Sequence, residues 1–280
     1  MRPFDLAAVT DLIRAALAED IGRGDLTTQL TVPAGLRATG HMVAKQDGVL
    51  AGAPIVERVF AQLGGNVTIT QPVADGAALT AGTTVLTVEG PAADLLTGER
   101  LALNFVQQLS GVATLTRCYV DAVQGTKARI VDTRKTTPGL RVLEKYAVRM
   151  GGGHNHRLGL DDGVLIKDNH LTAAGGVAAA GAAARAGVPH TLRIEVECAT
   201  LAQVDEALAA GAGTLLLDNM TIDQLAAAVQ RIGGRALVEA SGGVTLDTVR
   251  AIAETGVDLI SVGALTHSAP ALDLSMKIRL

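Results

Sequence analysis

The stretch LRIEVECATLAQVDEALAAGAGTLLLDNMTIDQLAAAVQRIGGRALVEASGG, residues 192–243, decides the fold. Short apolar runs rich in branched side chains alternate in it with segments of helical periodicity. The strand candidates are 192–196, 214–217 and 236–238, and the helix candidates are 200–210 and 221–231. Successive strands joined by a helix pair in parallel, because parallel neighbours require a crossover connection. This stretch therefore predicts a parallel α/β sheet.

The same alternation continues on both sides of this stretch. Further strand candidates lie at 128–131, 164–166 and 259–262, and further helix candidates at 139–150, 175–187 and 245–254. Six βα steps in a row favour a closed or nearly closed barrel, with an open doubly wound sheet as the alternative. No G-x-G-x-x-G sequence opens a helix, so dinucleotide binding lacks its main support.

Residues 1–105 have a mixed pattern that predicts a separate α/β domain. The elements expected there are a helix over 4–19, a Gly- and Thr-rich loop over 21–28, strands within 37–50, 66–70 and 83–88, and a helix over 53–63. A long helical pattern then runs from 92 to about 123, with a possible break at Gly111. We place the domain boundary at 105/106 and the barrel domain at 106–265.

Composition excludes several classes of protein. The 280 residues carry a formal net charge of −4 and include only five aromatic side chains, which disfavours nucleic-acid binding. The first 20 residues read as an amphipathic helix rather than a signal peptide, and no uncharged apolar run is long enough to span a membrane. The two cysteines, Cys118 and Cys198, are interpreted as packing residues of a protein in the reducing cytoplasm.

Polar or charged residues follow every apolar run, and in a βα barrel the chemistry lies at these carboxyl ends of the strands. The strand ends read D-T-R-K-T-T-P-G (132–139), K-D-N-H (167–170), E-V-E (195–197), D-N (218–219), E-A-S-G-G (239–243) and S-V-G-A (261–264). Residues 127–170 carry nine Lys and Arg against five Asp and Glu, a local charge of +4, which leaves −8 for the remainder. The net charge therefore hides a basic segment.

Four cations at or near strand ends are expected to converge on an anionic ligand: Arg134, Lys135, Arg157 and Lys167. His154, His156 and His170 lie in the same segment. The His-x-His spacing at 154–156 admits zinc, but no third ligand stands at a characteristic spacing, so we do not favour it.

Two acidic residues end adjacent strands. Glu197 and Asp218 are expected to face one divalent ion, and oxygen ligands of this kind suit Mg²⁺ shared with substrate phosphates. Glu195 lies on the same strand face as Glu197 and is a second candidate. The alternative is a structural ion pair with Arg193 or with a lysine of the barrel.

Glycines at two late strand ends point to a phosphate site. Ser241, Gly242 and Gly243 precede a helix expected to begin near Thr245, and Gly263 is followed by His267. Backbone amides approach a phosphate closely where side chains are absent. A cationic pocket, a metal-binding pair of carboxylates and a phosphate site together fit phosphoribosyl transfer.

The motifs resemble those of the quinolinate phosphoribosyltransferase family, in family order along nearly the whole chain. They are E-D-I-G-R-G-D-L-T-T (19–28), G-E-R-L-A-L-N-F (98–105), D-T-R-K-T-T-P-G (132–139), E-K-Y-A-V-R-M-G-G-G-H-N-H-R (144–157), K-D-N-H (167–170), E-V-E (195–197), L-D-N (217–219), E-A-S-G-G (239–243) and V-G-A-L-T-H (262–267). The resemblance implies the type II phosphoribosyltransferase fold, an N-terminal α/β sandwich joined to an incomplete α/β barrel. It also implies that a C-terminal tail, about 266–280, returns to the first domain.

The resemblance further implies roles for individual residues. Lys135, Lys167, Glu197 and Asp218 would be catalytic, with Mg²⁺ on Glu197 and Asp218; Arg100, Arg134, His156, Arg157 and Lys167 would bind quinolinate; and Ser241, Gly242, Gly243, Gly263 and His267 would bind phosphate. The family forms dimers or higher oligomers, in which the residue matching Arg100 reaches the neighbouring subunit's site.

The implied reaction joins quinolinate and phosphoribosyl diphosphate to give nicotinate mononucleotide, diphosphate and CO₂, in NAD biosynthesis. Three rivals remain at this point. They are a phosphoribosyltransferase acting on nicotinate or another anionic heterocycle, including the paralogue associated with molybdenum transport; a non-catalytic sensor of anionic metabolites; and a barrel aldolase using Lys167 as a Schiff base.

Overall fold

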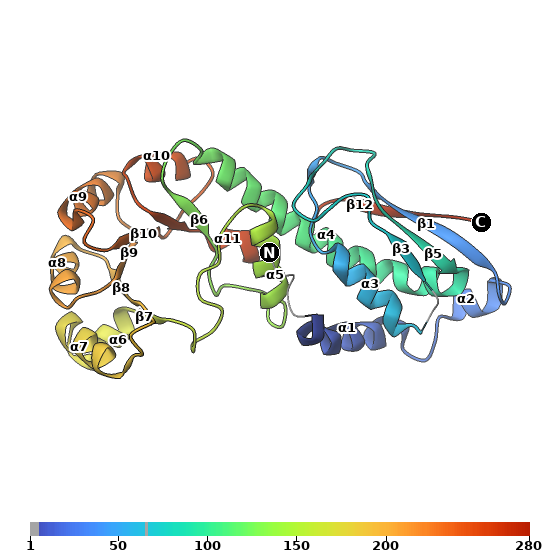
Figure 1. Cartoon of the computed structure of the whole chain (residues 1–280), viewed down its shortest axis with the longest axis horizontal. Helices are drawn as coiled ribbons and strands as arrows, with labels where there is room; N and C mark the ends of the chain where they lie inside the picture. Colours follow the sequence, from blue (N-terminus) through green and yellow to red (C-terminus); the bar gives the residue numbers. More distant parts are fainter. Residues whose placement is uncertain (1–5, 65–66) are drawn as a thin grey trace. The chain divides into compact units, whose positions relative to one another are not determined.

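The computed structural model describes residues 6–64 and 67–280, and the chain divides into two compact units (Figure 1). The first unit comprises residues up to Arg117, then Thr137–Gly152 and Ser268–Leu280; the second comprises Cys118–Thr136 and Gly153–His267. The helix expected from Phe4 is seen from Leu6, and Phe4 itself lies outside the described residues.

A four-stranded antiparallel sheet, in the order β12-β1-β5-β3, forms the centre of the first unit. Its strands are β1 (Arg37–Ala44), β3 (Thr68–Thr70), β5 (Thr84–Pro91) and β12 (Leu274–Arg279), and β2 (Gly48–Val49) pairs separately with β4 (Ala78–Leu79). The unit's helices are α1 (Leu6–Ile21), α2 (Leu26–Thr31), α3 (Ala53–Gln62), α5 (Arg141–Met150) and most of α4 (Ala92–Ala122). Residues of β12 pair antiparallel with β1, so the C-terminal segment belongs to this sheet.

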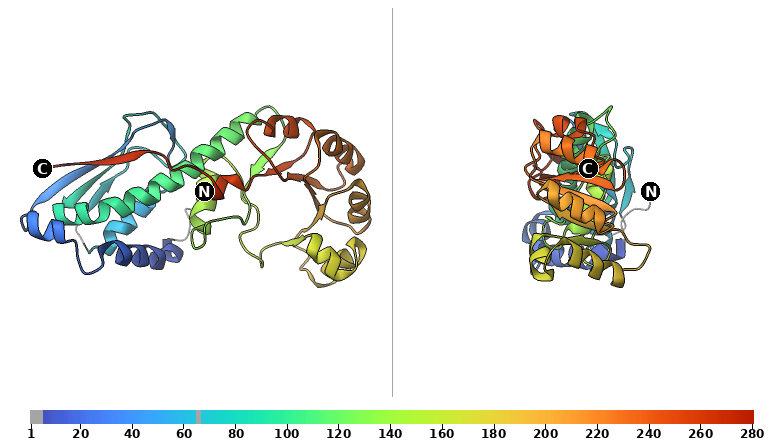
Figure 2. Two further views of the ribbon diagram at one scale, coloured as in Figure 1. Left: turned by 180° about the vertical axis from the view of Figure 1, so that it is seen from behind. Right: turned by 90° about the vertical axis from the view of Figure 1, so that its left-hand side faces the viewer.

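Helix α4 lies against one face of this sheet, and α3 packs on α4 (Figures 1 and 2). A Cβ added to Gly40 of β1 would lie 3.7 Å from Leu95 of α4, and one added to Gly98 of α4 would lie 2.7 Å from the Phe60 ring of α3. The core of the unit therefore forms where the sheet and these two helices meet.

The break expected at Gly111 is wrong, because α4 continues through it. A Cβ at Gly111 would collide with the backbone of Pro270 and Ala271. The glycine is therefore explained by the close approach of the C-terminal segment, and the helix tolerates its modest cost in helix propensity.

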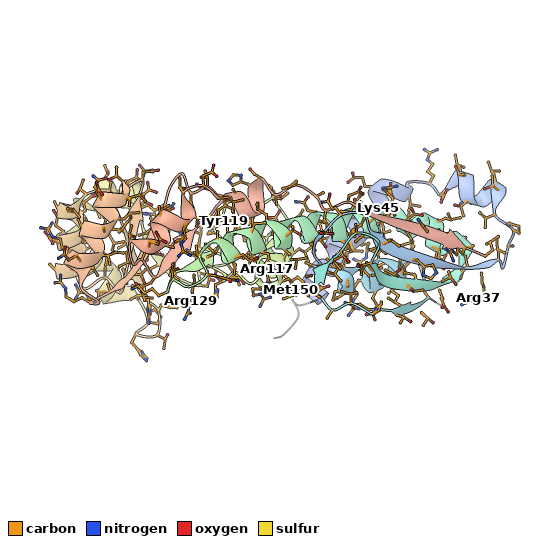
Figure 3. All side chains as sticks on the ribbon, turned by 90° about the horizontal axis from the view of Figure 1, so that it is seen from above. Arg37, Lys45, Arg117, Tyr119, Arg129 and Met150 are labelled. Carbon is orange, nitrogen blue, oxygen red and sulfur yellow. The ribbon has the colours of Figure 1, made fainter. Side chains whose placement is uncertain are left out.

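Helix α5 belongs to the first unit, whereas the sequence boundary at 105/106 assigned it to the barrel domain. Its C-terminal end lies directly against α4: Arg117 of α4, labelled with Met150 in Figure 3, donates from Nε to the carbonyl of Gly151 over 3.1 Å. A Cβ at Gly151 would lie 2.5 Å from the side chain of Thr116. Tyr146 of α5 also donates its hydroxyl proton to Asp75, over 2.6 Å.

The second unit contains a six-stranded parallel sheet in the order β6-β11-β10-β9-β8-β7, which confirms the parallel α/β prediction. Its strands are β6 (Arg129–Val131), β7 (Val164–Ile166), β8 (Ile194–Cys198), β9 (Thr214–Asp218), β10 (Leu237–Ser241) and β11 (Leu259–Ser261). Within the described residues β6 pairs with β11 and β7 with β8, so the curved sheet stays open between β6 and β7. The barrel is therefore incomplete (Figure 1).

The helices of the second unit form a layer outside the strands (Figure 1). They are α6 (Asp168–Ala174), α7 (Val177–Gly187), α8 (Leu201–Ala209), α9 (Ile222–Ile232), α10 (Val249–Glu254) and α11 (Ala264–His267). Thr200 and Gln203 form a capping box at the start of α8, and Thr221 and Gln224 form one at the start of α9. These side chains explain why both helices begin where the sequence predicted.

Two sequence expectations are corrected here. The helix expected near Thr245 begins at Val249, because the Thr248 hydroxyl accepts a hydrogen bond from the Thr245 amide and holds a turn first. Cys198 is buried at the end of β8, but Cys118 lies on an exposed face of α4 and does not pack in the core.

Candidate functional site

A cavity of about 300 Å³ lies at the carboxyl ends of the parallel strands. The lining comes from the loops after β6 and β7, from the segment between α5 and β7, and from the strands β7 to β11. Its residues are Thr133, Arg134, Lys135, His156, Arg157, Leu165, Lys167, Glu197, Leu216, Asp218, Glu239, Ser241 and Ser261. The structure therefore brings together eight of the residues singled out from the sequence: Arg134, Lys135, His156, Arg157, Lys167, Glu197, Asp218 and Ser241.

Five predicted residues lie outside this lining. Gly242, Gly243 and Gly263 lie in the loops after β10 and β11, and His267 is the last residue of α11. Arg100 is an exposed residue of α4 in the first unit. The sequence indicated the four residues of the second unit by their position after a strand. That position predicts the edge of the sheet at which a residue lies, but it does not predict how far the residue lies from the cavity.

The buried carboxylate of Asp132 holds the segment that carries His156 and Arg157. Its Oδ1 accepts the backbone N–H of His156 over 2.9 Å, and its Oδ2 accepts from Asn155 Nδ2 over 2.5 Å. His154 bridges to Val131 in parallel, so this segment runs beside β6. The aspartate was visible in the sequence only as the first residue after a strand, without an assigned role.

Two arginines in the lining of the cavity, Arg134 and Arg157, lie close enough to interact electrostatically. Burial lowers the pKa of the Arg157 guanidinium, and the neighbouring Arg134 guanidinium lowers it further. Arg157 Nη1 donates to the carbonyl of Gly163 over 3.1 Å, while Nε of Arg134 is buried without a hydrogen-bond partner among the described residues. Two neighbouring guanidinium groups with unused donor capacity are chemically suited to a carboxylate or phosphate.

Two carboxylates stand on adjacent strands. Burial raises the pKa of Glu197, the Lys167 ammonium lowers it, and the negative charges of Asp218 and Asp168 raise it. Lys167 Nζ lies 3.8 Å from Glu197 Oε2. Glu197 therefore forms an ion pair with a lysine of the barrel and also lies close to the carboxylate of Asp218. Oxygen ligands that repel each other in this way fit a divalent cation such as Mg²⁺.

Glu195 does not share this site, although it lies on the same strand face as Glu197. Its Oε2 lies 2.9 Å from His156 Nε2, and the nearby Glu239 carboxylate lies 3.9 Å from the same nitrogen. His156, Glu195 and Glu239 form the group of potential metal ligands found among the described residues, and His154 is not part of it. Strand alternation predicts the face of a residue but not how deeply it is buried, so the sequence missed this cluster.

Glycines shape the loops after β10 and β11. Gly242 has φ +94°, and a Cβ there would collide with the side chain and amide nitrogen of Asn219, itself at φ 54°. A Cβ at Gly263 would lie 3.1 Å from Lys135 Cδ and 3.3 Å from His267 Nε2. The loops therefore bring a lysine, a histidine and exposed backbone amides close together, which suits a phosphate.

An incomplete parallel barrel with clustered cations, neighbouring carboxylates and glycine loops at its strand ends is the arrangement expected of a phosphoribosyltransferase of the barrel type. The family model for the N-terminal domain of quinolinate phosphoribosyl transferase matches residues 25–110, and the model for its C-terminal domain matches residues 112–277. The chain therefore belongs to the quinolinate phosphoribosyltransferase family.

Individual relatives agree with this assignment. The chain is 51% identical over 267 residues to a probable carboxylating nicotinate-nucleotide pyrophosphorylase of Synechocystis, covering 94% of this chain and 90% of the relative. It is 50% identical over 277 residues to the carboxylating nicotinate-nucleotide pyrophosphorylase of Mycobacterium leprae, covering 97% of each. The crystal structure of NadC from Streptococcus pyogenes has a TM-score of 0.96 at 42% identity, covering 100% of this chain and 99% of that one.

Proposed function

We propose that the chain transfers the phosphoribosyl group of phosphoribosyl diphosphate to quinolinate and releases nicotinate mononucleotide, diphosphate and CO₂, as a step of NAD biosynthesis. The observation that carries the proposal is the cavity at the strand ends, in which Arg134, Arg157 and Lys135 lie in one lining with Glu197 and Asp218. A dicarboxylate needs several cations, and a diphosphate needs a metal site, so the two halves of the lining suit the two substrates.

The chemistry follows from these groups. Arg134, His156, Arg157 and Lys167 would orient quinolinate so that its ring nitrogen faces C1 of the ribose. As the bond from C1 to diphosphate breaks, Lys135 and Lys167 would stabilise the negative charge that develops on the leaving group. The ring nitrogen becomes positively charged on bonding to C1, which stabilises the electron pair left on the ring when the adjacent carboxylate departs as CO₂. A proton taken up from water then bonds to that ring carbon in place of the carboxylate. No protein nucleophile is required.

Mg²⁺ would be held by Glu197 and Asp218, and it would supply positive charge to the diphosphate. The raised pKa of Glu197, caused partly by the negative charges of Asp218 and Asp168, supports this assignment, because a cation there would relieve the repulsion. The phosphate on the ribose would be bound by the loops that contain Ser241, Gly242, Gly243, Gly263 and His267.

Arg100 would act in the site of a second copy of the chain, in a dimer or a higher oligomer. Its exposure on α4, outside the lining of the cavity, supports a role that needs another subunit. No helix among the described residues combines the length and apolarity that a membrane span requires. We place the enzyme in the cytoplasm, where cysteines such as Cys198 stay reduced.

The test supplies the purified protein with phosphoribosyl diphosphate, Mg²⁺ and quinolinate labelled with ¹⁴C in the carboxylate next to the nitrogen. We expect release of ¹⁴CO₂ in a one-to-one ratio with nicotinate mononucleotide, and loss of both products on chelation of the metal. Nicotinate serves as the competing acceptor. Turnover of nicotinate without CO₂ release from quinolinate by folded protein would overturn the proposal.

A further inference from the structure

The hydroxyl of Thr266 makes a buried contact that no step of the proposed reaction uses. Thr266 lies in the short helix α11 and is 1% exposed. Its Oγ1 donates to the backbone carbonyl of Lys135 over 2.8 Å, whereas the carbonyl of Gly263, in the turn before it, lies 3.3 Å away. A hydroxyl has a single proton to donate, so the shorter bond to Lys135 is favoured.

The backbone of Lys135 is held on both sides of its Cα atom. Its amide donates to Thr133 Oγ1 over 3.0 Å, and its carbonyl accepts from Thr266. The first bond joins residues two apart and lies within the loop that follows β6. The second joins this loop to a helix 131 residues later in the chain, so it fixes the place of the loop within the second unit.

The side chain of Lys135 lies against the loop that precedes α11. A Cβ added to Gly263 would lie 3.1 Å from Lys135 Cδ and 3.3 Å from His267 Nε2, so the lysine stem and the histidine ring approach the same glycine. Lys135 lines the cavity, whereas Thr266 is outside the lining and too deeply buried to contact a ligand there. Thr266 therefore acts on the site only through the residues that it holds.

This hydrogen bond connects two parts of the proposed site that must bind one substrate. Phosphoribosyl diphosphate carries a phosphate at one end of the ribose and a diphosphate at the other, so the glycine loop and Lys135 must be correctly spaced. Helix α11 begins directly after Gly263, so a bond from Thr266 to Lys135 sets that spacing. Charge on a leaving group is stabilised best by groups that are in place before the reaction begins.

We propose that Thr266 is a positioning residue, whose hydroxyl fixes the backbone of Lys135 and thereby holds the Lys135 ammonium where the diphosphate binds. The inference rests on the proposed function for the identity of that anion. It gives the threonine of the V-G-A-L-T-H motif a role that differs from the phosphate binding proposed for Gly263 and His267.

The first test observes the hydrogen bond by NMR of the substrate-free protein. Lys135–Thr136 is the only place in the sequence where a lysine precedes a threonine, so labelling lysine carbonyls with ¹³C and threonine amides with ¹⁵N gives one cross-peak through this peptide bond. A carbonyl that loses its donor moves upfield in ¹³C shift. We expect that shift in Thr266→Val, and a cross-peak near the wild-type position in Thr266→Ser, which keeps the hydroxyl. An unchanged cross-peak in Thr266→Val would overturn the inference.

Thr116→Val is the matched control for the loss of a buried hydroxyl. Thr116 is 0% exposed, and its Oγ1 donates to the carbonyl of Val112 within α4 over 2.7 Å. This variant should keep the wild-type cross-peak and the wild-type affinity for diphosphate. The cross-peak requires no turnover, so a failed activity assay with quinolinate would contradict the proposed function without affecting the NMR result.

The second test determines whether the effect of Thr266 passes through Lys135. The dissociation constant of inorganic diphosphate with Mg²⁺ is measured by calorimetry in the wild-type and Lys135→Ala backgrounds. Thr266→Val should weaken binding about tenfold in the first background and less than about twofold in the second, because effects that pass through one group are not additive. Thr266→Ser should bind within about twofold of the wild type. Equal weakening in both backgrounds, or equal weakening by valine and serine, would overturn the inference.

Discussion

At the scale of single residues, the site separates charge of opposite sign within one cavity. Burial and the neighbouring Arg134 lower the pKa of Arg157, while burial and the negative charge of Asp218 raise the pKa of Glu197. Repulsion within each cluster would be relieved by a ligand of opposite charge, so binding energy would be available for orienting the proposed substrates. The sequence predicted these residues because each lies at or near the end of an expected strand.

The sequence did not predict the contacts that His156 makes with other protein groups. Its neighbourhood was interpreted as cationic because the segment 127–170 is basic. Its ring, however, contacts Glu195 from a strand 39 residues later in the chain and the backbone of the residue that follows it. Spacing along the chain contains no information on such a long-range contact.

The close contact between Gly242 and Asn219 can be tested by substitution. Replacement by alanine should lower the free energy of unfolding by about 3 kcal/mol, because the backbone has φ +94° and the new Cβ collides with Asn219. Gly243→Ala is the matched control: φ is +60° and nothing lies within 4 Å, so the loss should be about 1 kcal/mol. Urea unfolding of both variants measures the difference, and equal losses would contradict the collision.

At the scale of elements, the sequence predicted most strands and helices of the barrel within a few residues. The 164–166 strand candidate coincides with β7, and the capping residues Thr200 and Thr221 mark the starts of α8 and α9. The failures come from contacts between distant segments. Helix α5 lies in the first unit because its end fits against Thr116 and Arg117 of α4, which no local pattern reveals.

The close contact between Gly111 of α4 and the C-terminal segment can be tested by substitution. Alanine there meets the carbonyl of Pro270, which is backbone and cannot rotate away, so the free energy of unfolding should fall by about 2–3 kcal/mol. The C-terminal segment that carries β12 should also become more sensitive to carboxypeptidase. Gly187→Ala, at the end of α7 with open space around it, should leave stability unchanged or raise it by up to about 1 kcal/mol. Wild-type stability in Gly111→Ala would show that the segment is displaced easily.

At the scale of the whole molecule, the opening between β6 and β7 separates two strand ends that both contribute to the cavity. Lys135 follows β6 and Lys167 follows β7, and the intervening strands supply the acidic residues. The incomplete barrel thus leaves its cationic residues on either side of an unpaired edge. The alternation of strands and helices alone indicated a closed or nearly closed barrel, with an open sheet as the alternative, because six βα steps do not reveal whether the first and second strands pair. The incomplete barrel was implied by the family resemblance, and the structure confirms it.

The proposed role of Arg100 requires a second copy of the chain, so it can be tested with mixtures of two inactive variants. Lys135 belongs to the cavity of its own chain, whereas Arg100 is proposed to act in the cavity of a second copy. Arg100→Ala and Lys135→Ala proteins should each be nearly inactive. If subunits exchange at random in an equimolar mixture of dimers, half are mixed, and each mixed dimer has one site with both residues intact. About a quarter of the wild-type activity per subunit should then return.

Mixing is measured as ¹⁴CO₂ release after the two variants have been dissociated together and reassociated, with each variant treated alone as the control. Recovery of activity requires that the two residues of one site come from different chains, because neither chain contains both. If Arg100 acted within its own chain, every site in the mixture would lack one residue or the other, and no activity would return. The outcome therefore distinguishes a shared site from a self-contained one without a structure of the oligomer.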